Sequence, residues 1–327
     1  MQTFRYEPID FERSTFRLLR LFKGEGHDDI QGELFQAWLN GDDLVPYHAL
    51  SYTWGGTDLS LTVTVNGRML GVTQNLYLAL TYLRSQEMDR ILWIDAICID
   101  QRNEKEQGHQ VQQMGGIYSR ADEVIFWLGP ATYETNVLMD SLKKLEQKSL
   151  ENASRKWGLA DGYWNDLWLS VQPDLMRRHS DLGTLQHKGL DLLLHRPWFE
   201  RVWILQEVAN AKRAVVCSGS RFISARLFAL APLLLQMRPE HHCQAVLDIM
   251  PGPSRKDSWW SKSRDLYALL LNFRESKASN PRDIVYALLG ISSDAHNTDS
   301  LRPDYTKGIP DVIRATTLFL FGLIEGK

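Results

Sequence analysis

The sequence is poor in cysteine and has no long apolar run, and each absence excludes a class of protein. Three cysteines among 327 residues, odd in number and far apart, exclude a disulfide framework. Cys98 and Cys217 lie in apolar, strand-like runs, which is typical of small buried hydrophobes. No signal-peptide block opens the sequence, and no apolar segment approaches the roughly 18 residues of a membrane span. We therefore expect a cytoplasmic protein without a membrane span.

An excess of basic residues is also missing. The formal charge of −3 argues against a nucleic-acid binder, which normally carries a basic surface. The net charge does not exclude a nucleotide ligand, because a nucleotide pocket needs only one or two nearby cationic side chains. Apolar residues at 44% and charged residues at 24% are ordinary for a globular protein, and the length allows about two domains.

Metal-binding and nucleophile motifs are absent as well. His241, His242 and Cys243 are adjacent in sequence, and adjacent histidines on one chain chelate a metal poorly. The sequence has neither the spacing of a structural zinc site nor a Gly-x-Ser-x-Gly elbow. We expect no metal and no bound cofactor.

The sequence does contain an alternation of apolar strands and amphipathic helices. Residues 1–46 have strand-like runs, and Asn66-Gly67 fits a two-residue hairpin turn. Residues 90–100 and 123–129 are typical of strands covered on both faces. This order predicts an open α/β fold. We expect a mainly parallel sheet flanked by helices, with an N-terminal β hairpin region and additional helical insertions.

Polar residues mark the predicted helix starts. Asn75 is expected to cap a short amphipathic helix, and Asn103 with Glu106 three residues later resembles a capping box. Farther along, Arg282 and Asp283 stand at the start of a helix, where we expect them to form a structural ion pair.

The pattern divides the chain into three parts. We expect a β-rich extension over residues 1–46, an α/β core over 47–220 with a loosely patterned insertion at about 132–194, and a helical part over 221–327 packed on the core. The last stretch, residues 312–327, reads as an unfinished amphipathic helix, which favours a chain that continues further.

One acid on a mostly apolar helix is the first candidate site residue. Glu207 follows Trp203 by one helical turn, and none of the residues three or four positions away is basic. In a functional interpretation the carboxylate faces a ligand, and Trp203 stacks on an aromatic ring or a cation. In a structural interpretation Glu207 lies at the rim of the core, bonded to backbone or to an arginine such as Arg196.

The end of an apolar strand offers a second candidate. Ser51, Tyr52 and Trp54 lie where open α/β sheets present their ligands. Gly55 and Gly56 allow backbone N–H groups to approach a phosphate closely. The alternative is a glycine turn leading into the hairpin, with Trp54 as a lid on the core.

Asp95 is the third candidate, at the polar end of the apolar run that begins at residue 90. A buried acid there either binds substrate or accepts backbone N–H bonds that shape a loop. The residues themselves favour the loop-shaping role over a catalytic one.

Four segments together resemble the fungal heterokaryon incompatibility (HET) domain. In chain order they are YHALSYTWGG, ILWIDAICIDQRNEKEQGHQVQQMGGIYSRADEVIFWLGP, HRPWFERVWILQEV, and SNPRDIVYALLGI followed by RPDYT. HET domains are similar to TIR domains, which are flavodoxin-like modules of immunity and cell-death signalling. In many catalytic TIR domains, a glutamate in a Trp-Cys-x-x-Glu-like helix cleaves the nicotinamide–ribose bond of NAD. Trp203 and Glu207 have the same spacing, with Ile204 where those domains often have Cys.

The resemblance implies a cell-death effector of fungal nonself recognition, with Glu207 as the catalytic residue and NAD as substrate. It also implies homo-oligomerisation on activation, and a C-terminal sensor domain or partner protein. The alternatives are a signalling module that kills through assembly without catalysis, and a nucleotide sensor that binds without turnover. The residues expected to bind the substrate are Ser51, Tyr52, Trp54, Gly55, Gly56, Asp95 and Trp203.

One carboxylate is enough for such a reaction. Ordinary glycosidases need a second carboxylic acid to protonate the leaving group. Nicotinamide in NAD is already a cationic pyridinium and departs neutral, so no general acid is required. What remains is to stabilise an oxocarbenium-like ribose, which a carboxylate in a water-poor site does electrostatically.

Overall fold

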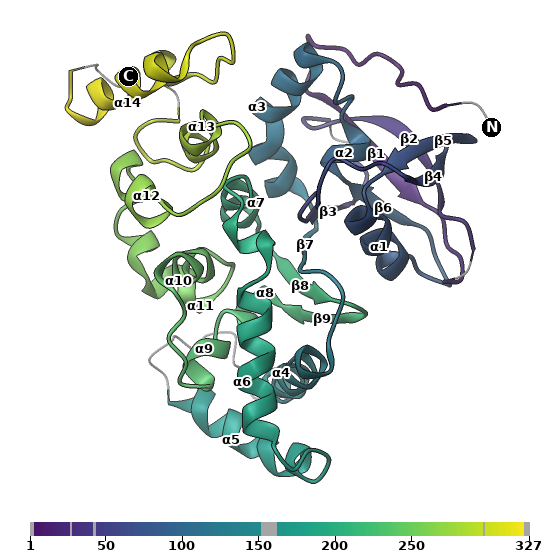
Figure 1. The fold of residues 1–327 in the computed structure, drawn as a ribbon, viewed down its shortest axis with the longest axis vertical. Coiled ribbons are helices and arrows are strands. Elements are labelled where there is room, and N and C mark those ends of the chain that lie inside the picture. The colour runs from purple at the N-terminus through teal and green to yellow at the C-terminus, as the bar shows by residue number, and fades with distance from the viewer. Residues whose placement is uncertain (1–2, 27, 42–43, 152–161, 297, 324–327) are drawn as a thin grey trace. The chain divides into compact units, whose positions relative to one another are not determined.

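The structure is a computed structural model that describes residues 3–26, 28–41, 44–151, 162–296 and 298–323 (Figure 1). The chain forms two compact units. The first comprises residues 1–132 and 211–222, and the second comprises residues 133–210 and 223–327.

Nine strands in the described part of the chain form one sheet, in the order β5-β4-β2-β1-β6-β3-β7-β8-β9. The strands predicted in the N-terminal region and around residues 48, 90, 123 and 214 are confirmed. The predicted strand over residues 90–100 is shorter than expected, because the chain leaves the sheet after Trp93 and forms a helical turn. The strands are β1 Thr15–Leu21, β2 Gln31–Trp38, β3 His48–Ser51, β4 Leu61–Val65, β5 Arg68–Val72, β6 Arg90–Trp93, β7 Glu123–Trp127, β8 Ala214–Ser218 and β9 Arg221–Ser224.

The centre of the sheet is parallel and doubly wound. β3 pairs in parallel with β6 on one side and with β7 on the other, and β7 pairs in parallel with β8. Along the chain these strands come in the order β3, β6, β7, β8, so their spatial order is second, first, third, fourth. That is the order of flavodoxin-like sheets, in which ligands bind at the carboxyl ends of the first and third strands. The predicted fold class is confirmed, and the ends of β3 and β7 lie where sheets of this topology bind their ligands.

Helices cover both faces of this parallel region. Trp93 on β6 contacts Tyr118, with ring centroids 5.2 Å apart, and Trp127 on β7 contacts Tyr82 at 5.4 Å. Ala49 pairs with both Trp93 and Val124, so Trp127, three residues after Val124, points to the opposite face from Trp93. The helices that carry Tyr82 and Tyr118 therefore lie on opposite faces of the sheet. The helices of the first unit are α1 Gln74–Leu83, α2 Asp95–Cys98 and α3 Glu104–Arg120.

The local signals of the first unit hold in part. The predicted hairpin between β4 and β5 is confirmed, with Asn66 and Gly67 at φ of 49° and 72°, as a type I′ turn requires. The predicted cap of α1 is wrong, because Thr73 caps the helix through the N–H of Leu76. Asn103 does cap α3, as predicted. The side chain of Glu106 turns into the core, so it does not complete the capping box.

A buried ion pair joins β1 to α3. Arg17 and Glu106 form two contacts, Nη1–Oε1 at 2.5 Å and Nη2–Oε2 at 3.0 Å, and their side chains are 3% and 2% exposed. Glu106 also accepts a hydrogen bond from the N–H of Asp100, and Arg17 donates to the carbonyl of Cys98. The pair therefore fixes the segment that follows α2 against the sheet.

Two cysteines fill the interior of the first unit, as predicted. Cys98 is 1% exposed and Cys217 is fully buried. Burial raises the pKa of the Cys98 thiol to about 12, so it stays protonated at neutral pH.

The second unit is helical, and small residues allow its helices to approach closely. A Cβ at Gly189 on α6 would overlap the carbonyl oxygen of Glu134 on α4, so these two helices are in backbone contact there. Residues within the loosely patterned insertion form α5 and α6, two regular helices. The helices are α4 Tyr133–Glu151, α5 Tyr163–Met176, α6 Leu182–Leu194, η2 Pro197–Glu200, α7 Ile204–Asn210, α8 Ala225–Phe228, α9 Ala231–Leu234, α10 His241–Asp248, α11 Pro253–Asp257, η3 Trp259–Ser261, α12 Leu266–Asn272, α13 Asp283–Leu289, η4 Asp299–Leu301 and α14 Ile309–Leu320.

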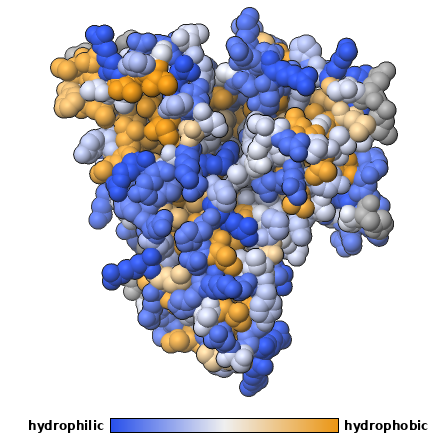
Figure 2. Space-filling model, viewed as in Figure 1, coloured by the Kyte–Doolittle hydropathy of each residue, from blue (hydrophilic) through white to orange (hydrophobic). Residues whose placement is uncertain are grey.

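The amphipathic helix expected near the end of the chain forms as α14. It buries Val312 and Thr316. Ile313 and Phe321 on and after this helix are 59% and 76% exposed, and Figure 2 shows apolar surface in this region. None of the helices in the described ranges has both the length and the apolar content needed to cross a bilayer.

We expect Glu106→Ala to lower the free energy of unfolding by about 3–5 kcal/mol, because it leaves the buried Arg17 guanidinium without its counter-ion. Glu104→Ala on the same helix removes the same charge from an exposed position and should cost less than about 1 kcal/mol. Urea denaturation followed by circular dichroism measures both. Equal effects of the two substitutions would contradict a special role for the ion pair.

Candidate functional site

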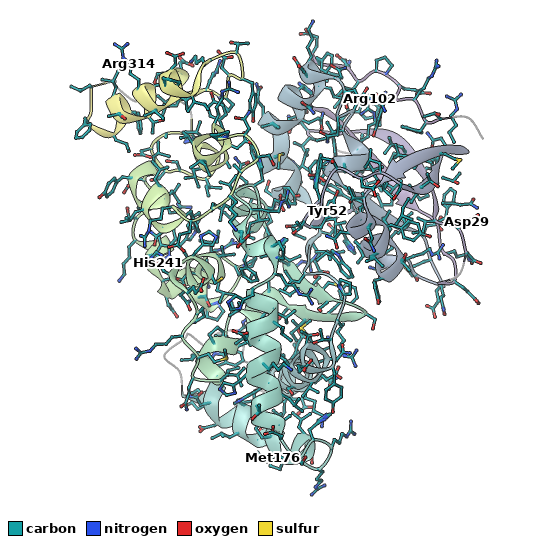
Figure 3. The ribbon with its side chains drawn as sticks, in the orientation of Figure 1. Asp29, Tyr52, Arg102, Met176, His241 and Arg314 are labelled. Atoms are coloured by element: carbon teal, nitrogen blue, oxygen red, sulfur yellow. The ribbon has the colours of Figure 1, made fainter. Side chains whose placement is uncertain are left out.

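The loop after β3 lies at the carboxyl edge of the sheet. Ser51 and Tyr52 are each 1% exposed, and Tyr52 lies in the interior of the first unit (Figure 3). Gly55 and Gly56 are exposed and have φ of 75° and 117°, in the left-handed region that favours glycine. The loop thus has two glycines at its exposed end and aromatic residues at its base.

The side chain of Asn75 connects this loop to β7 through hydrogen bonds. Its Nδ2 donates to the carbonyl of Thr53 at 2.5 Å, and its Oδ1 accepts from the indole Nε1 of Trp127 at 3.1 Å. A Cβ at Gly55 would lie 3.1 Å from the Cβ of Asn75, so the loop runs directly over this side chain. Asn75 therefore connects the ends of β3 and β7, the two strands at which this topology binds ligands.

Asp95, two residues after the end of β6, lies at the same edge of the sheet. Its Oδ2 accepts from the indole Nε1 of Trp54 at 2.9 Å, and its Oδ1 accepts from the N–H of Ala96 at 2.7 Å. The side chain of Gln101 donates to the carbonyl of Asp95 at 2.9 Å. These are contacts of the kind that the loop-shaping role requires, and the residue remains partly exposed.

Glu207 and Trp203 lie in the second unit. Glu207 is 2% exposed on α7, and its backbone N–H donates to the carbonyl of Trp203 at 3.5 Å. Trp203 directly precedes α7 and is partly exposed. The structure thus places the acid away from solvent and the indole one turn before it.

Side-chain contacts hold the short helix α7 in place. Arg255 donates to the carbonyls of Val208 and Ile249 at 2.7 and 2.5 Å, which satisfies an unpaired acceptor at the end of the helix. Burial lowers the pKa of Arg255 to about 10, which still leaves it charged at neutral pH. A Cβ at Gly290 would lie 2.8 Å from Nε2 of Gln206, so the end of α13 packs directly against α7.

Trp203 is anchored by Asp283. Its indole Nε1 donates to Oδ2 of Asp283 at 3.0 Å, and the hydroxyl of Tyr305 donates to Oδ1 at 2.7 Å. The expectation that Asp283 forms mainly an ion pair with Arg282 is therefore corrected. Its two oxygens accept hydrogen bonds from residues distant in sequence, and Arg282 contributes a smaller electrostatic effect.

Residues 47–207 match the family model described as Heterokaryon incompatibility protein (HET). This stretch of the chain is therefore similar to a HET domain. The chain is also 28% identical to Heterokaryon incompatibility protein 6, OR allele, from Neurospora crassa, in an alignment that covers 80% of this chain and 45% of the relative. The chain thus corresponds to less than half the length of that relative. No solved structure matches it.

The candidate site residues fall into two groups. Ser51, Tyr52, Trp54, Gly55, Gly56 and Asp95 share one edge of the sheet in the first unit, and Trp203 and Glu207 share one turn in the second. Three more partners, Asn75, Trp127 and Asp283, emerge from the fold. The sequence signals for them were a polar residue at a helix start, an indole ending a strand, and an acid in the segment SNPRD.

No cluster of three or more metal-ligating side chains is found in the ranges that the structure describes. His242, in the adjacent-histidine segment, contacts the carbonyl of Phe199 through Nε2 at 2.7 Å, which ties α10 to η2.

We expect Asn75→Ala to lower the free energy of unfolding by about 1–3 kcal/mol, because the indole N–H of Trp127, a residue that is 1% exposed, loses its acceptor. It should also speed hydrogen exchange of the amides in residues 53–56. Gln74→Ala, at the exposed neighbouring position, should leave both quantities near wild type. Unchanged hydrogen exchange of residues 53–56 in Asn75→Ala would show that the hydrogen bonds of Asn75 do not order the loop.

Proposed function

We propose that this protein is a cell-death effector of fungal nonself recognition that cleaves the nicotinamide–ribose bond of NAD. The family match and the name of the Neurospora relative support the recognition role. The observation that supports the chemistry is a carboxylate, Glu207, that is 2% exposed and stands one turn after a partly exposed indole. An acid in open solvent would be screened by water and would stabilise a cation only weakly.

The reaction needs a single carboxylate. The bond between C1′ of the ribose and the pyridinium nitrogen breaks, and its electron pair leaves with nicotinamide, which becomes neutral. Glu207 stabilises the positive charge that develops on the ribose. Water then adds to C1′ and loses a proton, so the products are nicotinamide, ADP-ribose and one proton.

The remaining residues are assigned by their chemistry. Trp203 stacks on the pyridinium ring, because the face of an indole attracts cations. The first unit offers a separate candidate binding site: the N–H groups of Gly55 and Gly56 suit a phosphate, on a loop that Ser51, Tyr52 and Trp54 support. Asp95 there suits a sugar hydroxyl, since each carboxylate oxygen accepts more than one hydrogen bond.

Activity is expected to require self-association, as the TIR resemblance implies. An assay at low protein concentration therefore tests assembly as well as chemistry. Turnover should rise faster than in proportion to protein concentration until the assembled state dominates. The same dependence allows a sensor domain or partner protein to control the enzyme.

Glu207→Gln keeps the size of the side chain and removes its charge. We expect it to reduce NAD consumption by on the order of 10²–10³-fold, the usual cost of losing one preorganised electrostatic group. Glu200→Gln is the matched control, because it removes a carboxylate that is 49% exposed and paired with Lys277. NAD and nicotinamide are quantified by liquid chromatography at high protein concentration, with folding checked by circular dichroism.

Two outcomes would contradict the enzymatic proposal. One is unchanged NAD in the presence of folded, associated wild-type protein. The other is a folded Glu207→Gln variant that still kills cells on overexpression, which would favour a signalling module that acts through assembly alone.

A further inference from the structure

Asp283 and Tyr305 lie outside residues 47–207, the part that matches the family model, yet both connect to the proposed site. Asp283 is the first residue of α13 and is 8% exposed. Its two oxygens accept separate hydrogen bonds, one from the indole of Trp203 and one from the hydroxyl of Tyr305. The carboxylate thus lies at the edge of the indole ring that carries Nε1.

The surrounding contacts make this arrangement rigid. Val202 donates to the carbonyl of Lys277 at 3.0 Å, and Lys277 donates to the carbonyl of Glu200 at 2.6 Å. On the other side, Tyr286 packs edge-on against Tyr305 with ring centroids 5.5 Å apart, and its hydroxyl donates to the carbonyl of Asp304 at 2.9 Å. Both donors to Asp283 therefore come from segments whose backbones are fixed.

A carboxylate in this position changes the electronic character of the indole. A charge-assisted hydrogen bond is roughly twice as strong as a neutral one, and it draws the N–H proton toward the oxygen. Electron density in the ring rises as a result, and the ring face becomes more attractive to a cation. The negative charge of Asp283 adds a second attraction, which is little screened because the carboxylate is buried.

Burial raises the pKa of Asp283, while the hydrogen bonds from Tyr305 and Trp203 and the charge of Arg282 oppose that rise. An indole N–H and a phenol hydroxyl can both donate to Asp283, so the two contacts suit an ionised carboxylate.

We propose that Trp203, Asp283 and Tyr305 form a recognition site for a planar aromatic cation. Trp203 offers the binding face, Asp283 supplies the charge, and Tyr305 holds Asp283 in place. This inference rests on the proposed function in naming the ligand as the pyridinium ring of NAD. It adds a selectivity that favours substrate binding and product release, because the site holds the charged substrate ring more tightly than the neutral nicotinamide that leaves.

Two small probes isolate this selectivity from catalysis. N1-methylnicotinamide carries the pyridinium charge and has no ribose to cleave, and nicotinamide is its neutral counterpart. We expect wild-type protein to bind the cation roughly 5–30-fold more tightly than the neutral probe, measured by calorimetry or ligand-observed NMR. Equal binding of the two probes, or preference for the neutral one, would overturn the proposal.

Substitutions test the role of each residue in the recognition site. Asp283→Asn should reduce the preference for the cation at least 5-fold and change binding of nicotinamide less than 2-fold. Trp203→Phe keeps an aromatic face but loses the N–H, and it should reduce the preference similarly. Tyr305→Phe leaves the Trp203–Asp283 bond in place but removes the second donor to Asp283, so it should reduce the preference measurably but less than Asp283→Asn does. Asp299→Asn removes an exposed carboxylate of the same unit, 69% exposed, and should have no effect.

Loss of binding to both probes in Asp283→Asn would show a purely structural role and refute the recognition site. If Asp283→Asn does not fold, Trp203→Phe provides the test. Unchanged cation preference in Trp203→Phe would also refute the recognition site. The proposed hydrolysis fails separately: wild-type protein that prefers the cation but leaves NAD intact contradicts the enzymatic proposal and leaves the binding site standing.

Discussion

A carboxylate that leaves water loses several kcal/mol of hydration, so a fold keeps it only where donors replace the solvent. Glu106 meets this constraint with the guanidinium of Arg17 and the N–H of Asp100. Asp283 meets it with an indole and a phenol hydroxyl. Because each acid draws donors from distant segments, its burial dictates which parts of the chain must come together. The ion pair at Glu106 in this way sets the path of the chain between α2 and α3, next to Asp95 at the carboxyl edge of the sheet.

The indoles of the two units repeat one arrangement. Trp54 donates to Asp95 in the first unit, and Trp203 donates to Asp283 in the second. In each case an acid at the first residue of a helix fixes the edge of an indole that remains partly exposed. A tryptophan held by its N–H keeps one ring orientation. In the binding that we propose at Trp203, this preorganisation lowers the entropic cost.

Periodic and local features of the fold could be predicted from the sequence, and long-range polar contacts could not. Buried runs such as residues 123–127 identify strands because both faces of a central strand need apolar side chains. Asn66-Gly67 identifies its turn because few residues adopt positive φ. Asn75, Glu106 and Asp283 were each given a role within their own helix, because spacing reveals neighbours one turn away. Their actual partners lie 52, 89 and 80 positions away, which only the folded chain reveals.

The anchoring of Trp203 by Asp283 and Tyr305 has a practical consequence for how fragments of this chain are chosen. The stretch that defines the family by similarity ends at residue 207. A fragment that stops there retains the tryptophan and the acid but leaves the indole without its two supports. It also lacks β8, the strand that completes one side of the parallel sheet. A fragment that is inactive for these reasons would say nothing about the chemistry of the intact protein.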